Sequence, residues 1–253
     1  MVLIFKSISL NINGIRSVVT QSLFKNFLFD QDIDVALLQE INDDNLDFLL
    51  PQYKYVSNPG EHNRGTAIVY RAHLIASNIE QSPCGRIIGL KVNEIQFVNI
   101  YAPSGSNQRQ ERLNFFSNDI VYYLRNTRLH TALGGDFNCV VDSQDQSSSP
   151  TNYCNSLSAL SKELKLIDVW RLLNPQKKEF TFFRNTSAAR LDRFYVSEEL
   201  APKISNCQII PVSFSDHSCV QLDIRSDCSL RPPPYGRNTW KLNTTLLNDI
   251  NVC

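Results

Sequence analysis

The sequence predicts an α/β (α+β) fold, a four-layer α/β sandwich in which two facing mixed β-sheets are flanked by helices. Apolar runs of strand length recur along most of the chain, and only a few stretches carry apolar residues at helical spacing. Many strands with few helices favour sheets that pack face to face and helices that cover the outside. With 253 residues, of which 42% are hydrophobic, the chain is long enough to bury a sizeable core.

The expected strands are short runs rich in apolar and β-branched residues. They are Leu3–Leu10, Val35–Gln39, Thr66–Tyr70, Arg86–Val92, Ile95–Tyr101, Leu129–Leu133, Phe180–Phe183, Leu191–Val196, Cys207–Val212 and Cys219–Ile224. Helical spacing of apolar residues occurs over Leu23–Leu28, Leu113–Leu124 and Leu157–Ile167, so a helix is expected at each.

Two polar segments interrupt or end this pattern. Ser143–Ser156 consists mainly of small polar residues whose burial cannot offset the entropy lost on ordering, so a long surface loop is expected there. The compact pattern stops near Arg225. We therefore expect one domain over residues 1–225, followed over 226–253 by a Pro-rich linker and the start of a truncated downstream region.

Composition excludes several classes of protein. The 25 basic and 25 acidic side chains cancel, so no global cationic field attracts nucleic acid, and binding of a polyanion must be local or helped by a metal. The seven cysteines include no C-x-x-C pair, which predicts neither a disulfide framework nor a zinc site and fits a reducing compartment. No signal peptide and no membrane segment are expected.

Short polar groups stand where several expected strands end. Asn11 and Asn13 point to the same side of an extended chain, although an Asn-Gly turn at Gly14 would explain them equally. Glu40 ends another strand. A carboxylate at the rim of a sheet suits Mg²⁺, while a solvated surface carboxylate is the alternative.

The stretch Leu129–Ser143 ends a strand with two glycines, an aspartate and an asparagine. The glycines allow a tight turn or a close approach, and Asp136 and Asn138 then face the same side while Phe137 turns inward. A carboxylate beside an amide is suited to orienting a water and holding a phosphoryl oxygen. An ordinary Asp/Asn turn is the alternative.

A histidine and a tyrosine complete the set of candidates. His217 follows Asp216, and a lone histidine is often no more than a satisfied surface residue. A histidine that donates to a phosphate is better held and kept cationic by a second carboxylate, for which Asp192 is a candidate. Tyr101 ends a strand, where its ring packs in the core or its hydroxyl reaches a phosphate.

In this order, the motifs N-x-N-G, Q-E, N-x-Y-A-P, G-D-F-N, L-D and S-D-H resemble the endonuclease/exonuclease/phosphatase superfamily. Over residues 4–224 the sequence is most similar to the apurinic-endonuclease-like endonuclease domain of LINE-type non-LTR retrotransposons, through "LNINGIR", "NIYAPS", "LGGDFN", "LIDVWRLLNPQKKEFTFF" and "SDHS". "NCVVD" resembles the clade that includes amphibian and fish elements, and Trp240–Asn243 resembles the segment after the nuclease. Asn13 stands where repair enzymes carry aspartate and LINE nucleases asparagine, which favours the retroelement.

The resemblance implies a Mg²⁺ ion, which Mn²⁺ may replace, held by Glu40 and Asn11 with Asp216 near the metal. It also implies a set of catalytic residues that address the water and the scissile phosphate. These are Asp136 for the water, Asn138, Tyr101 and His217 for the phosphate, Asp192 to orient His217, and Asn11 beside the metal.

The resemblance further implies that double-stranded DNA is the partner. The residues expected to contact DNA are Asn13, Arg16, Thr181, Arg184, Asn185, Thr186, Arg190 and Gln146. Two positions depart from the family: Gln146 stands where an arginine is common, and Ala189 where a serine is usual. A charged phosphate contact and a hydroxyl contact typical of the family are therefore missing from the sequence here.

The function implied is a Mg²⁺-dependent endonuclease that nicks double-stranded DNA by in-line attack of water on a phosphodiester. The 3′-hydroxyl would prime target-site reverse transcription by a downstream reverse transcriptase domain of the natural polyprotein. Such a protein is made in the cytoplasm and acts in the nucleus. The alternatives are an abasic-site repair endonuclease, a phosphomonoesterase of the same fold, and a binding module that has lost activity.

Overall fold

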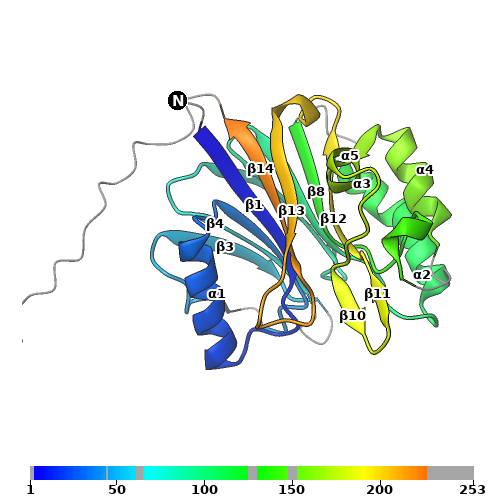
Figure 1. Cartoon of the computed structure of the whole chain (residues 1–253). Coiled ribbons are helices and arrows are strands. Elements are labelled where there is room, and N and C mark those ends of the chain that lie inside the picture. Colours follow the sequence, from blue (N-terminus) through cyan, green and yellow to red (C-terminus); the bar gives the residue numbers. More distant parts are fainter. Residues whose placement is uncertain (1–2, 44, 61–64, 125–129, 148–152, 227–253) are drawn as a thin grey trace, which may run out of the picture.

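The computed structural model describes residues 3–226 apart from 44, 61–64, 125–129 and 148–152. Two six-stranded sheets face each other, and helices lie on their outer sides (Figure 1). The predicted four-layer α/β sandwich is therefore confirmed. Apart from Ser226, the segment expected to be a Pro-rich linker and a truncated region lies outside the described residues.

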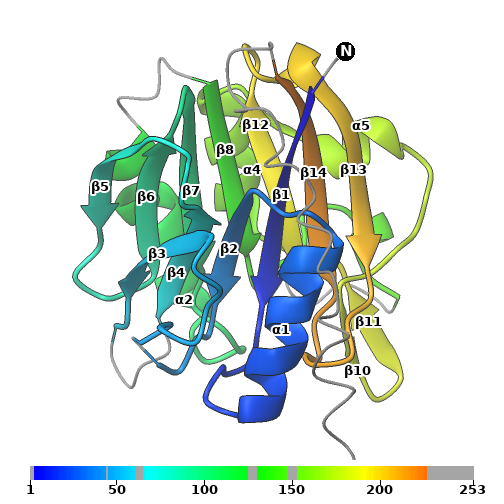
Figure 2. The same ribbon diagram turned by 90° about the vertical axis from the view of Figure 1, so that its left-hand side faces the viewer.

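The first sheet has the strand order β13-β14-β1-β2-β4-β3. Its strands are β1 (Leu3–Asn11), β2 (Val35–Gln39), β3 (Tyr53–Asn58), β4 (Thr66–Arg71), β13 (Ile204–Ile210) and β14 (Cys219–Ser226). Alternate residues of a strand point to opposite faces, and both faces are apolar here. Val35 and Leu37 pack between the sheets, whereas Ala36 and Leu38 pack toward the outer side. Helix α1 (Val18–Asp30) covers that side (Figure 2).

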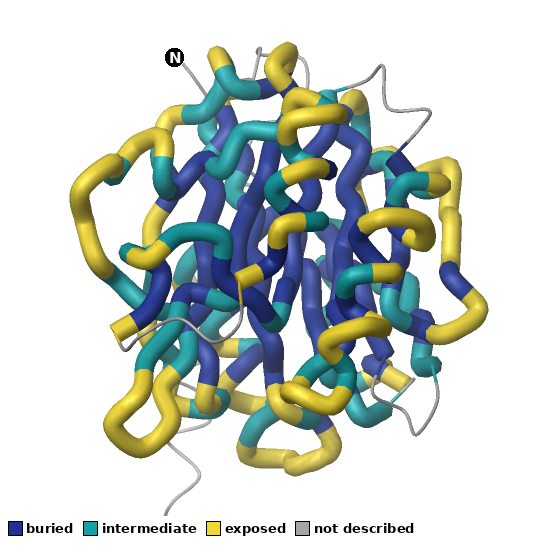
Figure 3. Tube along the Cα trace, turned by 90° about the vertical axis from the view of Figure 1, so that its right-hand side faces the viewer, coloured by how far each residue is buried: buried dark blue, intermediate teal, exposed yellow. Residues whose placement is uncertain are grey.

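The second sheet has the order β5-β6-β7-β8-β12-β9. Its strands are β5 (Ala76–Gln81), β6 (Ile87–Val92), β7 (Ile95–Tyr101), β8 (His130–Asp136), β9 (Leu166–Asp168) and β12 (Asp192–Ser197). Phe97 packs between the sheets, and Val98 and Ile100 pack on the outer side against the helical layer. The central strands are buried throughout, as the dark blue tubes show (Figure 3).

The helical layer on this sheet differs in detail from the prediction. Leu113–Leu124 is split into α2 (Arg109–Asn114), a π-helical turn (Phe115–Asp119) and α3 (Ile120–Leu124), and α4 runs over Asn155–Glu163. Ile167 was expected to extend the third helix but belongs to β9, because the chain leaves the helix at Leu164. A short α5 (Val169–Leu173) follows. Among the described residues, no helix combines the length and the apolar character needed to span a bilayer.

A small hairpin projects from the same end of the sandwich as the functional motifs (Figure 1). It consists of β10 (Phe182–Arg184) and β11 (Ser187–Ala189), which pair antiparallel. Two 3-10 turns, Ser143–Asp145 and Ala201–Lys203, complete the described elements.

Gly134 and Gly135, directly before Asp136, are each required for a different structural reason. A Cβ at Gly134 would lie 2.5 Å from the Phe194 ring and 2.7 Å from Leu37, so this position lets the two sheets approach closely. Gly135 has a φ of +150°, and a Cβ there would lie 2.1 Å from the carbonyl oxygen of Ile100. The close approach of the two sheets at Gly134 brings the end of β8 against the end of β1, where Asn11 is hydrogen-bonded to Asp136.

Polar side chains also join the sheets just inside the rim. Gln39 Nε2 donates to Asn99 Oδ1 at 2.6 Å, and Asn99 Nδ2 donates to the carbonyl oxygen of Leu38 at 2.8 Å. Both side chains are fully buried. Because a buried amide requires partners, these bonds fix the register of one sheet on the other directly beside Glu40 and Tyr101.

Candidate active site

The predicted catalytic side chains come from strand ends that meet at one end of the sandwich. Asp136 ends β8, where it pairs with Tyr101 of the parallel β7 and with Asp192 of the antiparallel β12. Asn11 ends β1 in the other sheet, opposite Gln39 of β2, so Glu40 follows directly. The topology therefore gathers residues that are far apart in the sequence, such as Asn11 and Asp136, which are 125 positions apart.

Asn11 links the carboxylates of the two sheets. Its side-chain nitrogen donates to Glu40 Oε1 at 3.1 Å and to Asp136 Oδ2 at 3.0 Å, while its Oδ1 accepts the backbone N–H of Asn13 at 3.1 Å. Glu40 has a φ of +50°, which is unusual for a residue other than glycine or asparagine. Such backbone strain is typical of functional sites, and here the bond from Gly14 N to the Glu40 carbonyl at 2.8 Å holds it.

Asp136 is buried and is oriented by Asn138. The backbone N–H of Asn138 donates to Asp136 Oδ1 at 2.9 Å, and its side-chain nitrogen donates to Asp136 Oδ2 at 3.2 Å and to the Ala102 carbonyl at 2.9 Å. Both protons of the Asn138 amide are thus engaged, because an amide nitrogen has only two. Asn138 thus orients Asp136 in this structure, and its predicted contact with the scissile phosphate stays a prediction.

His217 and Asp192 form a close pair. His217 Nδ1 lies 2.8 Å from Asp192 Oδ2, and both side chains are buried. Burial alone would lower the pKa of His217, but the Asp192 carboxylate outweighs it and raises the pKa to about 10. The imidazole is therefore cationic at neutral pH, as the sequence predicted for a histidine that has a second carboxylate beside it.

Two neighbouring groups have shifted pKa values that suit acid–base chemistry. Burial, together with the nearby Asp192 carboxylate, raises the pKa of Asp136 to about 6. Burial and a hydrogen bond to Glu40 raise the pKa of the Tyr101 hydroxyl well above its usual range. At neutral pH, Asp136 is accordingly a moderately strong base, and the Tyr101 hydroxyl keeps its proton as a donor.

The cluster has donors that fit a hard divalent cation. Ligand atoms of Asp136, Asp192 and His217 lie within 4.8 Å of one another, and of these the two carboxylates can bind a cation while His217 is protonated. Asp192 Oδ1 is buried with no hydrogen-bond partner among the described residues. Carboxylate and amide oxygens are what Mg²⁺ prefers, so the residues present fit the ion. The predicted ligand Glu40 lies outside this group and reaches it through Asn11, whereas Asp216 is exposed and lies outside it too.

The expected DNA contacts divide into exposed and buried residues. Five are exposed around the site, on the segment after β1 and at the hairpin tip: Asn13, Arg16, Arg184, Asn185 and Thr186. Thr181 and Arg190 were predicted to contact DNA as well, but both are buried, at 0% and 1% exposed, so this assignment is wrong for them. Each is instead engaged by protein groups.

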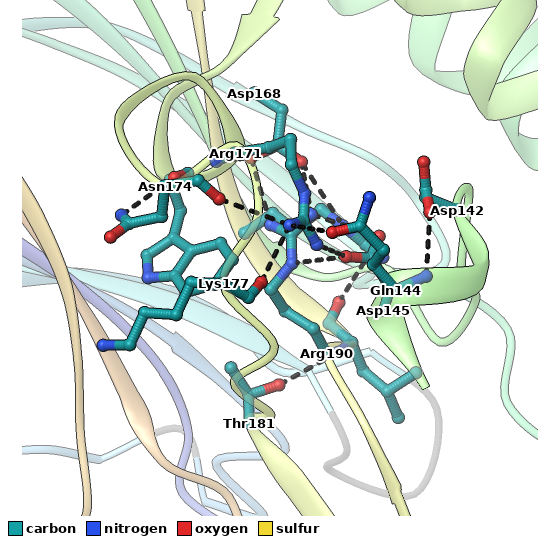
Figure 4. A network of polar contacts seen from close by, with 12 residues as sticks. Asp142, Gln144, Asp145, Asp168, Arg171, Asn174, Lys177, Thr181 and Arg190 are labelled. Carbon is teal, nitrogen blue, oxygen red and sulfur yellow. Dashed lines mark hydrogen bonds and ion pairs between the residues drawn. The ribbon is translucent and has the colours of Figure 1, made fainter. Parts of the chain in front are cut away.

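Arg190 belongs to a buried ion network that centres on Asp145 (Figure 4). Asp145 Oδ1 accepts from Arg190 Nε at 2.9 Å and from Arg171 at 2.6 Å, and Oδ2 accepts from Arg193 at 3.2 Å. Arg190 also pairs with Asp168 at 2.7 Å. These contacts anchor the beginning of Ser143–Ser156, which the sequence predicted to be a surface loop.

The two departures from the family pattern lie opposite each other. Gln146 and Ala189 form an antiparallel bridge between the segment after Asp145 and strand β11. Ser147 N donates to the Ala188 carbonyl at 2.9 Å, and Ser147 Oγ accepts from Ala188 N at 2.8 Å. Gln146 is 9% exposed, so its predicted contact with DNA is wrong in this structure: the residue packs against the base of the hairpin.

One supporting residue was missed by the sequence reasoning. Ser215 Oγ accepts the backbone N–H of His217 at 3.0 Å and donates to the Asn11 carbonyl at 2.6 Å. It therefore ties the histidine segment to the end of β1. A serine two residues before a histidine suggests a local side-chain turn, which was the available signal.

The sequence matches the endonuclease/exonuclease/phosphatase family over residues 8–217. The chain belongs to this family, which confirms the resemblance found in the motifs. A curated relative is the "Transposon TX1 uncharacterized 149 kDa protein" of Xenopus laevis, 34% identical over 178 residues, which are 65% of this chain and 13% of that protein. The chain thus spans a small part of its transposon relative.

Two further proteins are similar over most of the chain. The DNA-(apurinic or apyrimidinic site) endonuclease of Dictyostelium discoideum is 27% identical over 247 residues, with 84% of this chain and 68% of that protein covered. The crystal structure of the AP endonuclease LMAP from Leishmania major superposes with a TM-score of 0.78 at 20% identity, covering 88% of each chain. The transposon relative agrees with the predicted kinship to an apurinic-endonuclease-like domain of a retroelement.

Proposed function

We propose that this chain is a Mg²⁺-dependent endonuclease that nicks double-stranded DNA. One observation carries the proposal: the hydrogen-bonded series Glu40, Asn11 and Asp136 meets the Asp192–His217 pair at a single end of the sandwich. A carboxylate base and a cationic histidine close together are what displacement at a phosphodiester requires. The family and the names of the relatives support the same chemistry.

In the proposed reaction Asp136 accepts the proton of the attacking water as the water oxygen bonds to phosphorus. The bond from phosphorus to the 3′-oxygen breaks, and the leaving 3′-oxygen takes a proton from water, which gives a 5′-phosphate and a 3′-hydroxyl. Its pKa of about 6 leaves it ionised at neutral pH while keeping it basic enough for this step. His217, cationic through Asp192, donates a hydrogen bond to a non-bridging oxygen of the phosphate and offsets its developing charge. The Tyr101 hydroxyl would supply a second donor by turning its proton from Glu40 to the phosphate, and Asn138 keeps the Asp136 carboxylate in orientation.

Glu40 and Asn11 would hold the Mg²⁺ ion, with Asp136 and Asp192 beside it. When bound, the ion would neutralise charge on the phosphate. Even with His217 charged, the carboxylates of Glu40, Asp136 and Asp192 outnumber the positive groups of this cluster, so a divalent cation also offsets their mutual repulsion. Mn²⁺ would be tolerated in its place, because it accepts the same oxygen ligands.

Plasmid relaxation tests the function. Wild-type protein should convert supercoiled plasmid to the nicked form with Mg²⁺ and not with a chelator, and both His217→Ala and Asp136→Ala should lose most of the rate. His130→Ala is the matched control, since His130 lies at the opposite end of β8 from Asp136. Site variants that nick as fast as wild type would refute the assignment.

The retrotransposon origin is a further part of the proposal. Two observations support it: position 13 is an asparagine, as in LINE nucleases, and the chain is similar to the Xenopus laevis transposon protein. A nick that leaves a 3′-hydroxyl would prime reverse transcription by a polymerase domain further along the natural protein, which would act in the nucleus. Extension of the nicked strand by an added reverse transcriptase tests the end chemistry, and a 3′-phosphate at the nick would contradict it.

The similarity to an apurinic endonuclease favours one second candidate, cleavage at abasic sites. A duplex with a single stable abasic analogue, compared with the intact duplex, separates the two functions. A preference for the lesion by orders of magnitude would support repair, whereas similar cleavage of both would support nicking of intact DNA.

A further inference from the structure

Thr181 has an unexpected place between the two halves of the catalytic pair. Its side chain is fully buried just before β10, and its hydroxyl oxygen accepts the backbone N–H of Leu191 at 2.9 Å and that of Asp192 at 3.0 Å. The hydroxyl therefore holds the start of β12, whose first residue is Asp192 (Thr181 is labelled in Figure 4).

The backbone of the same residue holds the histidine. The Thr181 carbonyl accepts the N–H of Ser218 at 2.7 Å, and the next residue, Phe182, forms a β-bridge with His217. The Phe182 ring lies 4.7 Å from the imidazole, centroid to centroid. Thr181 N also donates to the Ala189 carbonyl at 3.0 Å, which closes the base of the hairpin.

Asp192 and His217 need such a link because they belong to different sheets. Asp192 begins β12 of the second sheet, and His217 precedes β14 of the first. Sheet packing alone does not set a contact of 2.8 Å between a side chain at the end of a strand in one sheet and a side chain on a loop of the other. A residue that is hydrogen-bonded to both segments does.

We propose that Thr181 is a positioning residue that fixes Asp192 against His217 and connects the β10–β11 hairpin to them. The catalytic consequence rests on the proposed function. Without the hydroxyl, the buried N–H of Asp192 and the partly buried N–H of Leu191 lose their acceptor, and the strand end moves to find another. Displacements of about 1 Å at a catalytic group cost on the order of 100-fold in rate.

Valine at position 181 removes the hydroxyl at nearly constant volume, and serine keeps it. We expect Thr181→Val to lower kcat for plasmid nicking by about 100-fold while KM stays nearly constant, because substrate contacts are unchanged. Thr181→Ser should restore kcat. Thr131→Val is the control for loss of a buried threonine hydroxyl, since Thr131 is equally buried at the far end of β8.

A second measurement does not depend on nicking. The Nδ1 proton that His217 shares with Asp192 should give a downfield NMR resonance, identified by its absence in His217→Gln. We expect this resonance to disappear or broaden by exchange in Thr181→Val and to persist in Thr181→Ser and Thr131→Val. Thr181→Ala removes the same acceptor and carries the test if the valine variant does not fold.

Two results would overturn the inference: an unchanged His217 proton resonance in the variants that lack the hydroxyl, or an equal loss of kcat in Thr131→Val. If wild-type protein fails to nick DNA, the proposed function fails. The resonance still decides whether Thr181 positions the pair.

Discussion

Replacing Asp145 with asparagine tests the buried ion network that anchors the segment after β8. Asp145 is fully buried and accepts hydrogen bonds from the guanidinium groups of Arg171, Arg190 and Arg193. Arg190 and Arg193 are themselves buried, so asparagine would leave two interior cations with Asp168 as their remaining counter-ion. The substitution keeps the volume of the side chain and changes its charge.

The size of the effect follows from this burial. Removing one partner of a buried ion pair costs about 3–5 kcal/mol, because the remaining charge stays out of water. For a domain of this size, each kcal/mol shifts Tm by about 2–4 °C, so Asp145→Asn should melt about 6–20 °C below wild type. Burial alone would raise the pKa of Asp145, but the guanidinium groups of Arg193 and Arg190 hold it well below its usual range.

The direction of that shift predicts a pH dependence of stability. A carboxyl with a depressed pKa in the folded protein contributes stability that is present above its unfolded pKa of about 3.9 and is lost as the pH falls below that value. The difference in unfolding free energy between wild type and Asp145→Asn should therefore be full at neutral pH and shrink toward low pH.

Urea unfolding followed by circular dichroism measures this difference. Glu198→Gln is the matched control, since Glu198 pairs with Lys165 at 3.4 Å with both side chains more than half exposed. Such a pair contributes roughly 0–1 kcal/mol. The reasoning is refuted if Asp145→Asn costs no more than this control.

Three further outcomes are expected. The nicking rate should rise through about pH 6 as Asp136 loses its proton and fall through about pH 10 as His217 loses its own, so a flat pH profile would contradict both assignments. Glu40→Gln should weaken Mg²⁺ binding by at least about tenfold in calorimetry without DNA, and equal affinity would remove Glu40 from the metal site. Replacing residues 184–189 at the hairpin tip should move the nick positions in a sequenced digest at similar total nicking, whereas the same positions would exclude this hairpin from target choice.

Much of the fold follows from local apolar patterns. Val35–Gln39 and Ile95–Tyr101 are strands with the predicted bounds, because central strands buried on both faces form continuous apolar runs. β5 was missed since it is an exposed edge strand whose composition is mostly polar. The short β9 and β11 exist only through their pairing with β12 and β10.

The candidate site divides in the same way. Where polar residues interrupt the end of an apolar run, the sequence identifies them, and Asn11, Asp136 and His217 were found in this manner. It also indicates that a histidine of this type needs a carboxylate, and Asp192 lies 2.8 Å away. These inferences depend only on residue types and on their immediate neighbours in the sequence.

Contacts between distant residues were decided by the tertiary structure alone. Thr181 lies in the predicted strand Phe180–Phe183 and Arg190 just before the next predicted strand, and both were expected to contact DNA, yet both are buried. Arg190 turns inward because Asp145, 45 residues away, supplies its counter-charge in the interior. Burial and partner are properties of the packed chain, since neighbours far apart in sequence fix them. For this reason the local motifs and their resemblance to a family marked the candidate residues, and only the fold showed which residues hold them in place.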